Sequence, residues 1–173
     1  MKTKPNVKPK RLKFNKFTGE FKPHVVPEGM LLIVDTREQL PLFNPPPQGL
    51  VITRDTLHNG DYSLRGFEDK IAVERKGVSD FLTYITVERE RTQKKLDRMK
   101  SFDFKALVIE EDEDMLYFAS PYSAVSPEAI RQSLVSMQIR YGLHLYMSSD
   151  RRKIERVVLD WFIKYFNVKR EAQ

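Results

Sequence analysis

The chain has 173 residues, with 30 basic and 24 acidic side chains, a formal net charge of +6 and no cysteine. This length suits one compact domain, and the lack of cysteine excludes disulfides, a thiol nucleophile and a cysteine-based zinc site. The longest apolar run, residues 30–34, is too short to cross a bilayer, and no apolar stretch follows the basic N-terminus. We therefore expect no membrane association and an intracellular location: cytoplasm or nucleoid, a host cell for a viral source, or the nucleus for a eukaryotic one.

The N-terminal segment carries the positive charge. Eight basic side chains and one acidic one give residues 1–22 a net charge of +7, so the remaining residues carry −1. Four prolines and the lack of a sustained period predict a flexible basic arm over residues 1–28. Such an arm suits a polyanion, most often nucleic acid, although an arm that docks on the body through its phenylalanines fits the sequence equally well. Its candidate DNA contacts are Lys8, Lys10, Arg11, Lys13 and Lys16.

Short apolar and β-branched runs predict six strands along the body of the chain. The glycine turn at Asn59-Gly60 precedes the third, and a five-residue loop joins the third and fourth strands into a hairpin. The expected strands are residues 30–35, 50–56, 61–64, 71–76, 104–109 and 143–147.

Helices are expected between and after these strands. Ser79 is expected to cap a helix beginning near Asp80, which breaks or leaves the core in the polar stretch 88–95 and resumes around Leu96. Ser126-Pro127 starts a helix that Gly142 ends, and Ser149-Asp150 starts the last one. Strands alternating with helices predict one α/β domain over residues 29–168, followed by a C-terminal tail over residues 169–173.

The fourth strand carries the most informative charges. Because side chains alternate along a strand, Glu74 and Lys76 share one face and Arg75 lies on the other. Asp61 follows the turn glycine, and in the hairpin its carboxylate would converge on Glu74. Two carboxylates can hold a hard divalent cation, and a nearby lysine can assist the attacking water in phosphodiester hydrolysis. An ordinary cross-strand ion pair is the alternative, and these residues alone favour it.

Further carboxylates change that balance. Asp35 ends the first strand, Glu38 follows it, and Asp80 lies four residues after Lys76. Sites in α/β sheets lie at strand ends, where these acids could converge. Clustered acids repel one another unless a cation lies among them, so a purely structural cluster would be costly.

In their order and spacing, these residues resemble a known signature. Gly60-Asp61, Glu74-Arg75-Lys76 and Asp80 resemble the GD…ERKxxxD pattern of the XPF-type structure-specific DNA endonucleases, and residues 34–38 resemble that family's VDxRE segment. Arg89 and Gln93 are similar to its R-x3-Q pair. The resemblance covers residues 30–166. It implies a restriction-endonuclease-like (PD-(D/E)XK-type) α/β fold, with a central mixed sheet flanked by helices.

The resemblance also implies roles for individual residues. Asp35, Asp61 and Glu74 resemble ligands of Mg²⁺ or Mn²⁺, and Lys76 resembles the catalytic lysine. For Arg75, a surface ion pair and a supporting role in the site are equally good explanations. Arg37 either contacts phosphate or pairs with a neighbouring acid. The supporting residues implied are Arg37, Glu38, Arg75 and Asp80.

The implied activity is metal-dependent hydrolysis of phosphodiester bonds in branched DNA: a flap, a fork or a four-way (Holliday) junction, in DNA repair, recombination or replication. DNA is the expected partner, with a homodimer or a protein partner beside it. The sequence has no Walker loop, so we expect no use of ATP.

DNA positioning is expected from the arm, from a partner, or from the polar stretch with Arg89 and Arg91, because the family's helix-hairpin-helix module is absent from this sequence. For the polar stretch, a mixed solvated helix face is the alternative. Two other functions stay open: a catalytically silent DNA-binding or dimerisation module of the same fold, and a restriction-type nuclease acting on plain duplex.

Overall fold

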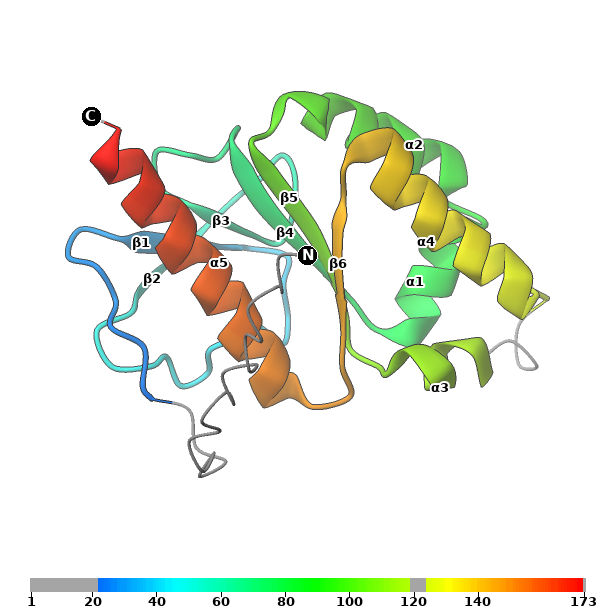
Figure 1. The fold of residues 1–173 in the computed structure, drawn as a ribbon, viewed down its shortest axis with the longest axis horizontal. Helices are drawn as coiled ribbons and strands as arrows, with labels where there is room; N and C mark the ends of the chain where they lie inside the picture. The colour runs from blue at the N-terminus through cyan, green and yellow to red at the C-terminus, as the bar shows by residue number, and fades with distance from the viewer. Residues whose placement is uncertain (1–21, 119–123, 173) are drawn as a thin grey trace, which may run out of the picture.

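A six-stranded mixed sheet forms the centre of the computed structural model, which describes residues 22–118 and 124–172 (Figure 1). The strand order is β2-β1-β3-β4-β5-β6, and β3 is antiparallel to both of its neighbours while the other pairs are parallel. Every predicted strand is confirmed to within one residue at each end. The strands are β1 (Leu31–Asp35), β2 (Val51–Asp55), β3 (Tyr62–Leu64), β4 (Ile71–Lys76), β5 (Phe104–Ile109) and β6 (His144–Met147).

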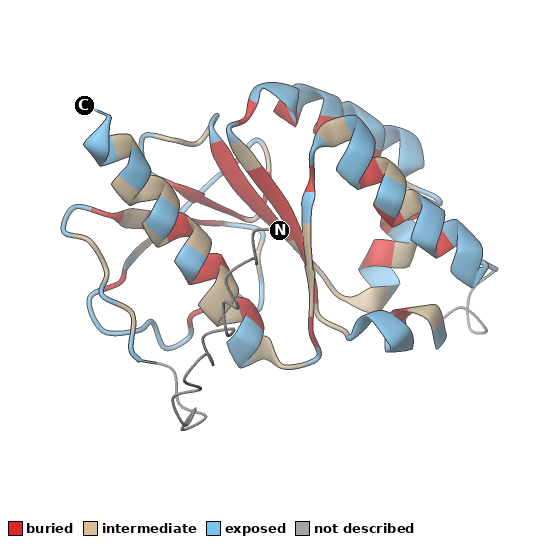
Figure 2. Cartoon of the chain, in the orientation of Figure 1, coloured by how far each residue is buried: buried red, intermediate tan, exposed pale blue. Residues whose placement is uncertain are grey.

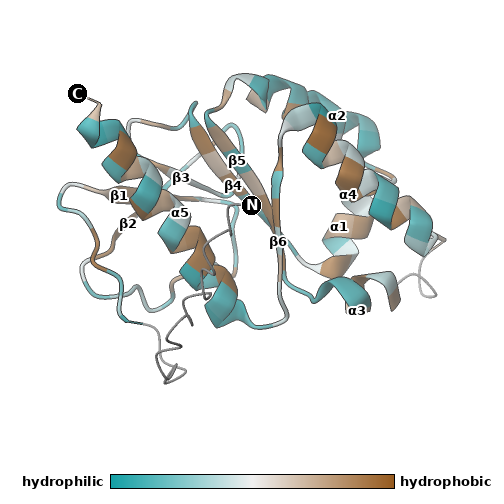
Figure 3. Ribbon diagram, viewed as in Figure 1, coloured by the Kyte–Doolittle hydropathy of each residue, from teal (hydrophilic) through white to brown (hydrophobic). Residues whose placement is uncertain are grey.

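Helices cover both faces of the sheet, so the central strands β4 and β5 are buried along most of their length (Figure 2). On one face lies α5 (Arg151–Glu171), along which hydrophobic and hydrophilic residues alternate (Figure 3). Its Val158 and Phe162 belong to one core cluster with Val73 of β4. On the other face lie α1 (Val78–Ile85), α2 (Arg89–Arg98), the 3-10 turn η1 (Met99–Ser101), α3 (Glu113–Phe118) and α4 (Pro127–Tyr141).

The start of α1 differs from the prediction. Gly77 is its N-cap, with no side-chain cap, so Ser79 lies inside the first turn and its predicted capping role is wrong. The reason is that β4 runs to Lys76 and the helix starts at Val78, which leaves a single residue between them.

The polar stretch after α1 is itself helical. The predicted break is confirmed between Ile85 and Arg89, but the helix resumes at Arg89 rather than near Leu96. Thr92 and Leu96 lie one turn apart and are both buried, and Thr92 Oγ1 donates a hydrogen bond to the Tyr84 carbonyl at 2.9 Å. This one buried stripe is enough to dock a helix of low overall hydropathy.

The later helix ends agree well with the sequence. Ser126 Oγ accepts a hydrogen bond from the Ala129 N–H, Gly142 ends α4 in the left-handed conformation, and Asp150 caps α5. However, α5 continues to Glu171, so residues 169–171 of the predicted tail are helical. Lys169 pairs there with Asp103 at 2.7 Å, which helps to keep this last turn in place.

The described end of the predicted arm packs on α5. His24 Nε2 lies 2.9 Å from Asp160 Oδ1, and Arg156 donates to the Lys22 carbonyl at 3.0 Å. The five lysines and arginines predicted to contact DNA from the arm lie outside the described residues. Within residues 22–118 and 124–172, no helix combines the length and apolar character needed to cross a membrane.

Candidate active site

Three of the predicted acids lie where β1, β3 and β4 come together. The backbone N–H of Asp35 donates to the Asp61 carbonyl at 2.8 Å, and the Asp61 N–H donates to the Val73 carbonyl at 2.9 Å. Val34 and Val73 face the core beneath α5, so alternation places Asp35 and Glu74 on the opposite side, toward α1 and α2. The sheet therefore places Asp61 between Asp35 and Glu74, and these backbone contacts support the part of the prediction that brings Asp61 next to the strand of Glu74.

Gly60 sets the position of Asp61. It adopts a φ of +78°, a conformation that favours glycine, and an added Cβ would lie 3.0 Å from the Ala72 Cβ and 3.1 Å from the Val73 carbonyl oxygen. Only a residue without a side chain lets the turn approach β4 this closely. The Gly-Asp order is thus explained by backbone geometry: the glycine allows the contact, and the aspartate follows directly at the sheet.

Asp35 is held by Arg37 and by the backbone. Its carboxylate accepts bonds from Arg37 Nε at 2.7 Å, Arg37 Nη2 at 2.9 Å and the Leu57 N–H at 2.7 Å. The hydrogen bonds from the Arg37 side chain are the main cause that lowers the pKa of Asp35 to about 2. Of the two predictions for Arg37, pairing with a neighbouring acid is therefore the one found here, and the role of Asp35 as a metal ligand stays a prediction.

Glu74 has an ammonium group on each carboxylate oxygen. Lys76 Nζ lies 2.9 Å from Oε1, and Lys95 of α2 bonds to Oε2. Burial alone would raise the pKa of Glu74, but the charges of Lys95 and Lys76 outweigh it and lower that pKa. Lys76 Nζ also lies 5.5 Å from the centre of the Tyr84 ring. Strand alternation predicted the Glu74–Lys76 pair.

Lys95 and Tyr84 did not figure among the predicted site residues. Lys95 lies three residues after Thr92 and next to Leu96, so helical spacing places it at the edge of the buried stripe. That spacing was the available signal. We call Asp61, Glu74, Lys76 and Lys95 the acid–lysine site.

Asp61 has no cationic side chain bonded to it. Its Oδ2 accepts the Arg75 N–H at 2.7 Å, and among the described residues it forms no ion pair within 4 Å. Burial, and next the negative charge of Glu74, raise the pKa of Asp61 to about 7. Asp35 and Glu74 each bond to a cationic side chain, so Asp61 is the acid of the three whose negative charge is least compensated.

Arg75 lies on the α5 side of β4 and belongs to a different set of contacts. Its guanidinium bonds to Glu38 Oε1 at 2.6 Å and also to Glu110, and Glu110 Oε1 accepts Arg151 Nη1 at 2.7 Å. We call Glu38, Arg75, Glu110 and Arg151 the arginine network. Arg151 also donates to the carbonyls of the loop after β1, so the network ties that loop and α5 to the sheet.

The other predicted residues lie at the surface. Asp80 is exposed in the first turn of α1 and acts on Lys76 only through its charge. Arg91 is exposed and pairs with Glu88 at 3.2 Å, and Arg89 lines a groove between α1, α2 and α4. Both arginines thus stand on the helix that supplies Lys95.

The acid–lysine site fits a divalent cation by its chemistry. Asp61 and Glu74 supply the oxygen donors that Mg²⁺ prefers, and a cation between them would remove the repulsion that raises the pKa of Asp61. The side chains are not arranged as a finished metal centre: in the described part of the chain, no group of three or more His, Cys, Asp or Glu could hold a metal ion.

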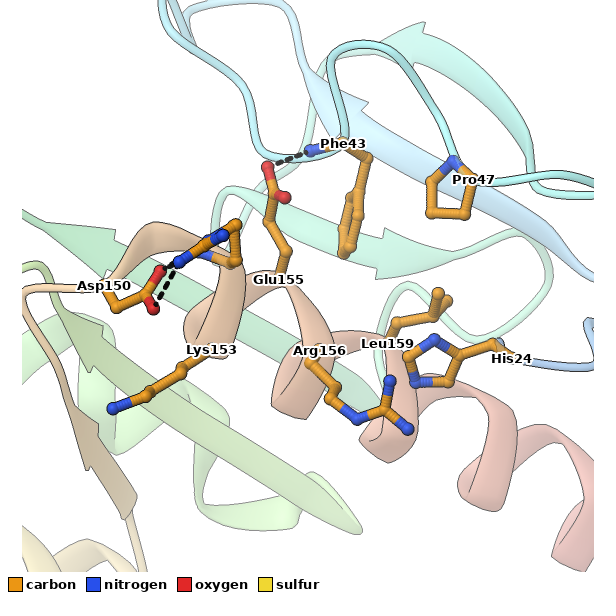
Figure 4. A pocket seen from close by; sticks show the side chains of 9 residues that line it. His24, Phe43, Pro47, Asp150, Lys153, Glu155, Arg156 and Leu159 are labelled. Atoms are coloured by element: carbon orange, nitrogen blue, oxygen red, sulfur yellow. Dashed lines mark hydrogen bonds and ion pairs between the residues drawn. The ribbon is translucent and has the colours of Figure 1, made fainter. Parts of the chain in front are cut away.

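A separate hollow lies on the α5 side, between the first turns of α5 and the loop before β2 (Figure 4). Glu155 accepts a hydrogen bond from the Phe43 N–H at 2.9 Å, and Asp150 pairs with Arg152 at 3.2 Å. No residue of the acid–lysine site lines the hollow. The charged side chains of Glu155 and Asp150 on its wall form structural contacts with Phe43 and Arg152.

Comparisons with known proteins agree with this geometry. The model of the ERCC4 domain matches residues 34–159. Among solved structures, XPF from Aeropyrum pernix is similar with a TM-score of 0.57 and 21% identity over 78% of this chain. XPF from Aeropyrum pernix in complex with DNA is similar with a TM-score of 0.56 and 18% identity over 81% of this chain. The predicted resemblance and the restriction-endonuclease-like fold are both confirmed.

The chain spans 60% and 66% of the lengths of these two solved chains. A search of curated protein sequences gave no match.

Proposed function

The chain belongs to the ERCC4-domain family, and from this premise we propose that it is a divalent-metal-dependent endonuclease that cuts branched DNA. One observation carries the proposal: Glu74 pairs with Lys76, and burial together with the nearby charge of Glu74 raises the pKa of Asp61 to about 7. A buried acid pair of this kind is costly as structure alone. Perturbed acids in such an arrangement are typical of functional sites.

Each residue of the site then has a role. Asp61 and Glu74 would hold Mg²⁺ or Mn²⁺, with Asp35 as a third ligand once it leaves Arg37. A bound divalent cation would activate water and neutralise charge that builds on the phosphate. Lys76 lies on the same face as Glu74 and donates to the attacking water or to the phosphate oxygens.

The wider surroundings support the site. The arginine network fixes the loop after β1, which carries Glu38, and Gly60 fixes Asp61 against β4. Arg37, whose side chain is 68% exposed, is available to a phosphate at the edge of the site. We infer DNA as the substrate because XPF from Aeropyrum pernix has been solved in complex with DNA. A branched substrate, and a homodimer or protein partner, stay predictions from the sequence.

The test is cleavage of labelled flap, fork, four-way-junction and plain duplex DNA in the presence of Mg²⁺. We expect the wild type to cut the branched DNAs, and Glu74→Gln and Lys76→Met to be slower by at least about 100-fold, the usual effect of removing a group that transfers protons or stabilises charge. Glu128→Gln and Lys164→Met are matched controls, because both residues are exposed and lie outside the polar stretch 88–95.

The outcomes separate the alternatives. Equal cleavage by all folded variants would show that the acid–lysine site is not the active site. DNA binding without cleavage by any variant would identify the silent module instead. Cleavage of plain duplex as fast as of branched DNA would identify a restriction-type nuclease.

A further inference from the structure

The two ammonium groups on Glu74 occupy the oxygens that a metal would need. Lys76 Nζ lies 2.9 Å from Oε1, Lys95 bonds to Oε2, and the Glu74 side chain is only 6% exposed. Each ammonium uses one of the about four lone-pair sites of the carboxylate and repels a divalent cation that approaches the same group. A metal that binds through Glu74 therefore competes with the two lysines.

Lys95 is the lysine better placed to leave. Lys76 lies on β4, two residues from Glu74, and its ammonium stays over the Tyr84 ring. Lys95 reaches Glu74 from α2 rather than from the strand that carries Glu74, and its side chain is 22% exposed, as is that of Lys76. Its flexible stem and compact ammonium allow it to turn outward without moving the helix.

We infer that Lys95 is a built-in competitor of the metal: it occupies Glu74 in the metal-free protein and leaves when a divalent cation binds. The inference rests on the proposed function, because it takes Glu74 as a metal ligand. With Lys95 in place, two ammonium groups bond to Glu74. Without it, the site is negative and attracts a divalent cation. Lys95 thus sets the metal concentration at which the site fills.

Calorimetric titration of Mn²⁺ into the full chain tests this without any DNA. An opposite charge within about 4–6 Å changes the charging equilibrium of a carboxylate by roughly 10- to 1000-fold. We therefore expect Lys95→Met to bind Mn²⁺ about tenfold more tightly than the wild type. Lys95→Arg keeps a cation on Glu74 and should bind no more tightly than the wild type.

The control is Lys94→Met, which removes the same charge from an exposed position one residue away. Because exposed charges are screened by solvent and salt, its Mn²⁺ affinity should stay within about twofold of the wild type. Lys95→Gln, which keeps a hydrogen-bond donor for Glu74, replaces Lys95→Met if that variant does not fold. It is also expected to bind more tightly than the wild type.

An affinity of the folded Lys95 variant that is unchanged or weaker, while the wild type binds Mn²⁺ and Glu74→Gln does not, overturns the role of Lys95 alone. If the wild type binds no Mn²⁺, or Glu74→Gln binds it equally well, the proposed function itself fails. The two failures are therefore distinguishable in one set of titrations.

Discussion

Strand β4 has a set of ion pairs on each side, and the two sets differ in chemistry. On the α5 side, Arg75 bonds to both Glu38 and Glu110, and Arg151 bonds to Glu110 as well. Each acid of the arginine network thus has a guanidinium partner. On the α1–α2 side, both ammonium groups bond to Glu74. From the residues that the structure describes, Asp61 receives only the backbone N–H of Arg75.

We interpret the arginine network as structural and the acid–lysine site as the site of the function proposed above. A guanidinium is planar and always charged, and it holds two acids in fixed positions. An ammonium is a compact point charge on a flexible stem, so it can be exchanged for another cation. Functional sites often destabilise the ligand-free protein, and binding of the ligand removes this cost. The rest of the fold must then keep the protein folded. Here Arg75, the centre of the arginine network, lies one residue from Glu74 on the same strand.

The largest effect is expected on the structural side. Arg75→Met would leave Glu38, whose side chain is 7% exposed, as a buried charge without its cation. Breaking a buried ion pair in this way costs about 3 to 5 kcal/mol, and we expect about 3 kcal/mol here because Glu110 keeps Arg151. Urea unfolding of the metal-free protein measures this loss.

Arg131→Met is the matched control, because Arg131 pairs with Glu128 on the exposed face of α4 and its loss should leave the stability almost unchanged. In a double-mutant cycle, Glu38→Gln should recover part of the loss in the Arg75→Met background. Equal losses for Arg75→Met and Arg131→Met would mean that the arginine network is not structural.

A smaller effect of opposite sign is expected on the functional side. Because burial raises the pKa of Asp61 from 3.8 to about 7, the folded chain holds a proton between these values that the unfolded chain has lost. Stability of the metal-free wild type should therefore fall as the pH rises from about 4 to 7 and stay low above it. The two pKa values set a ceiling of roughly 4 kcal/mol.

Asp61→Asn removes this loss and keeps an acceptor for the Arg75 N–H. Since Asp61 is partly open to solvent, we expect the variant to be more stable than the wild type by about 2 kcal/mol at pH 8 and equal to it near pH 4. Chemical unfolding in a chelator at both pH values measures the difference. A variant that is less stable at pH 8 would show that the Asp61 charge is already compensated.

Much of the site was predictable because its pattern is local. Strand alternation separates Glu74 and Lys76 from Arg75, and the Gly60-Asp61 turn places the second acid. The contact of Lys95 with Glu74 depends on how α2 docks, which follows from the two buried residues of that helix. Helical spacing places Lys95 beside the buried stripe of α2, but it does not predict that Lys95 contacts Glu74.

The same reason limits other parts of the prediction. Pairing of Arg75 with Glu110 depends on the register between β4 and β5, and pairing of Glu110 with Arg151 depends on the docking of α5. The Ser79 cap failed because the length of β4, rather than a capping residue, decides where α1 begins.

The most direct test is the effect of Mn²⁺ on the melting temperature at pH 8, compared between the wild type and Asp61→Asn. A ligand that binds only the folded state stabilises it, by about 2.7 kcal/mol at a concentration of 100 times its Kd. We expect Mn²⁺ to raise the melting temperature of the wild type and to have little effect on the variant. No increase in the wild type, or an equal increase in both proteins, would contradict a cation site at Asp61 and Glu74.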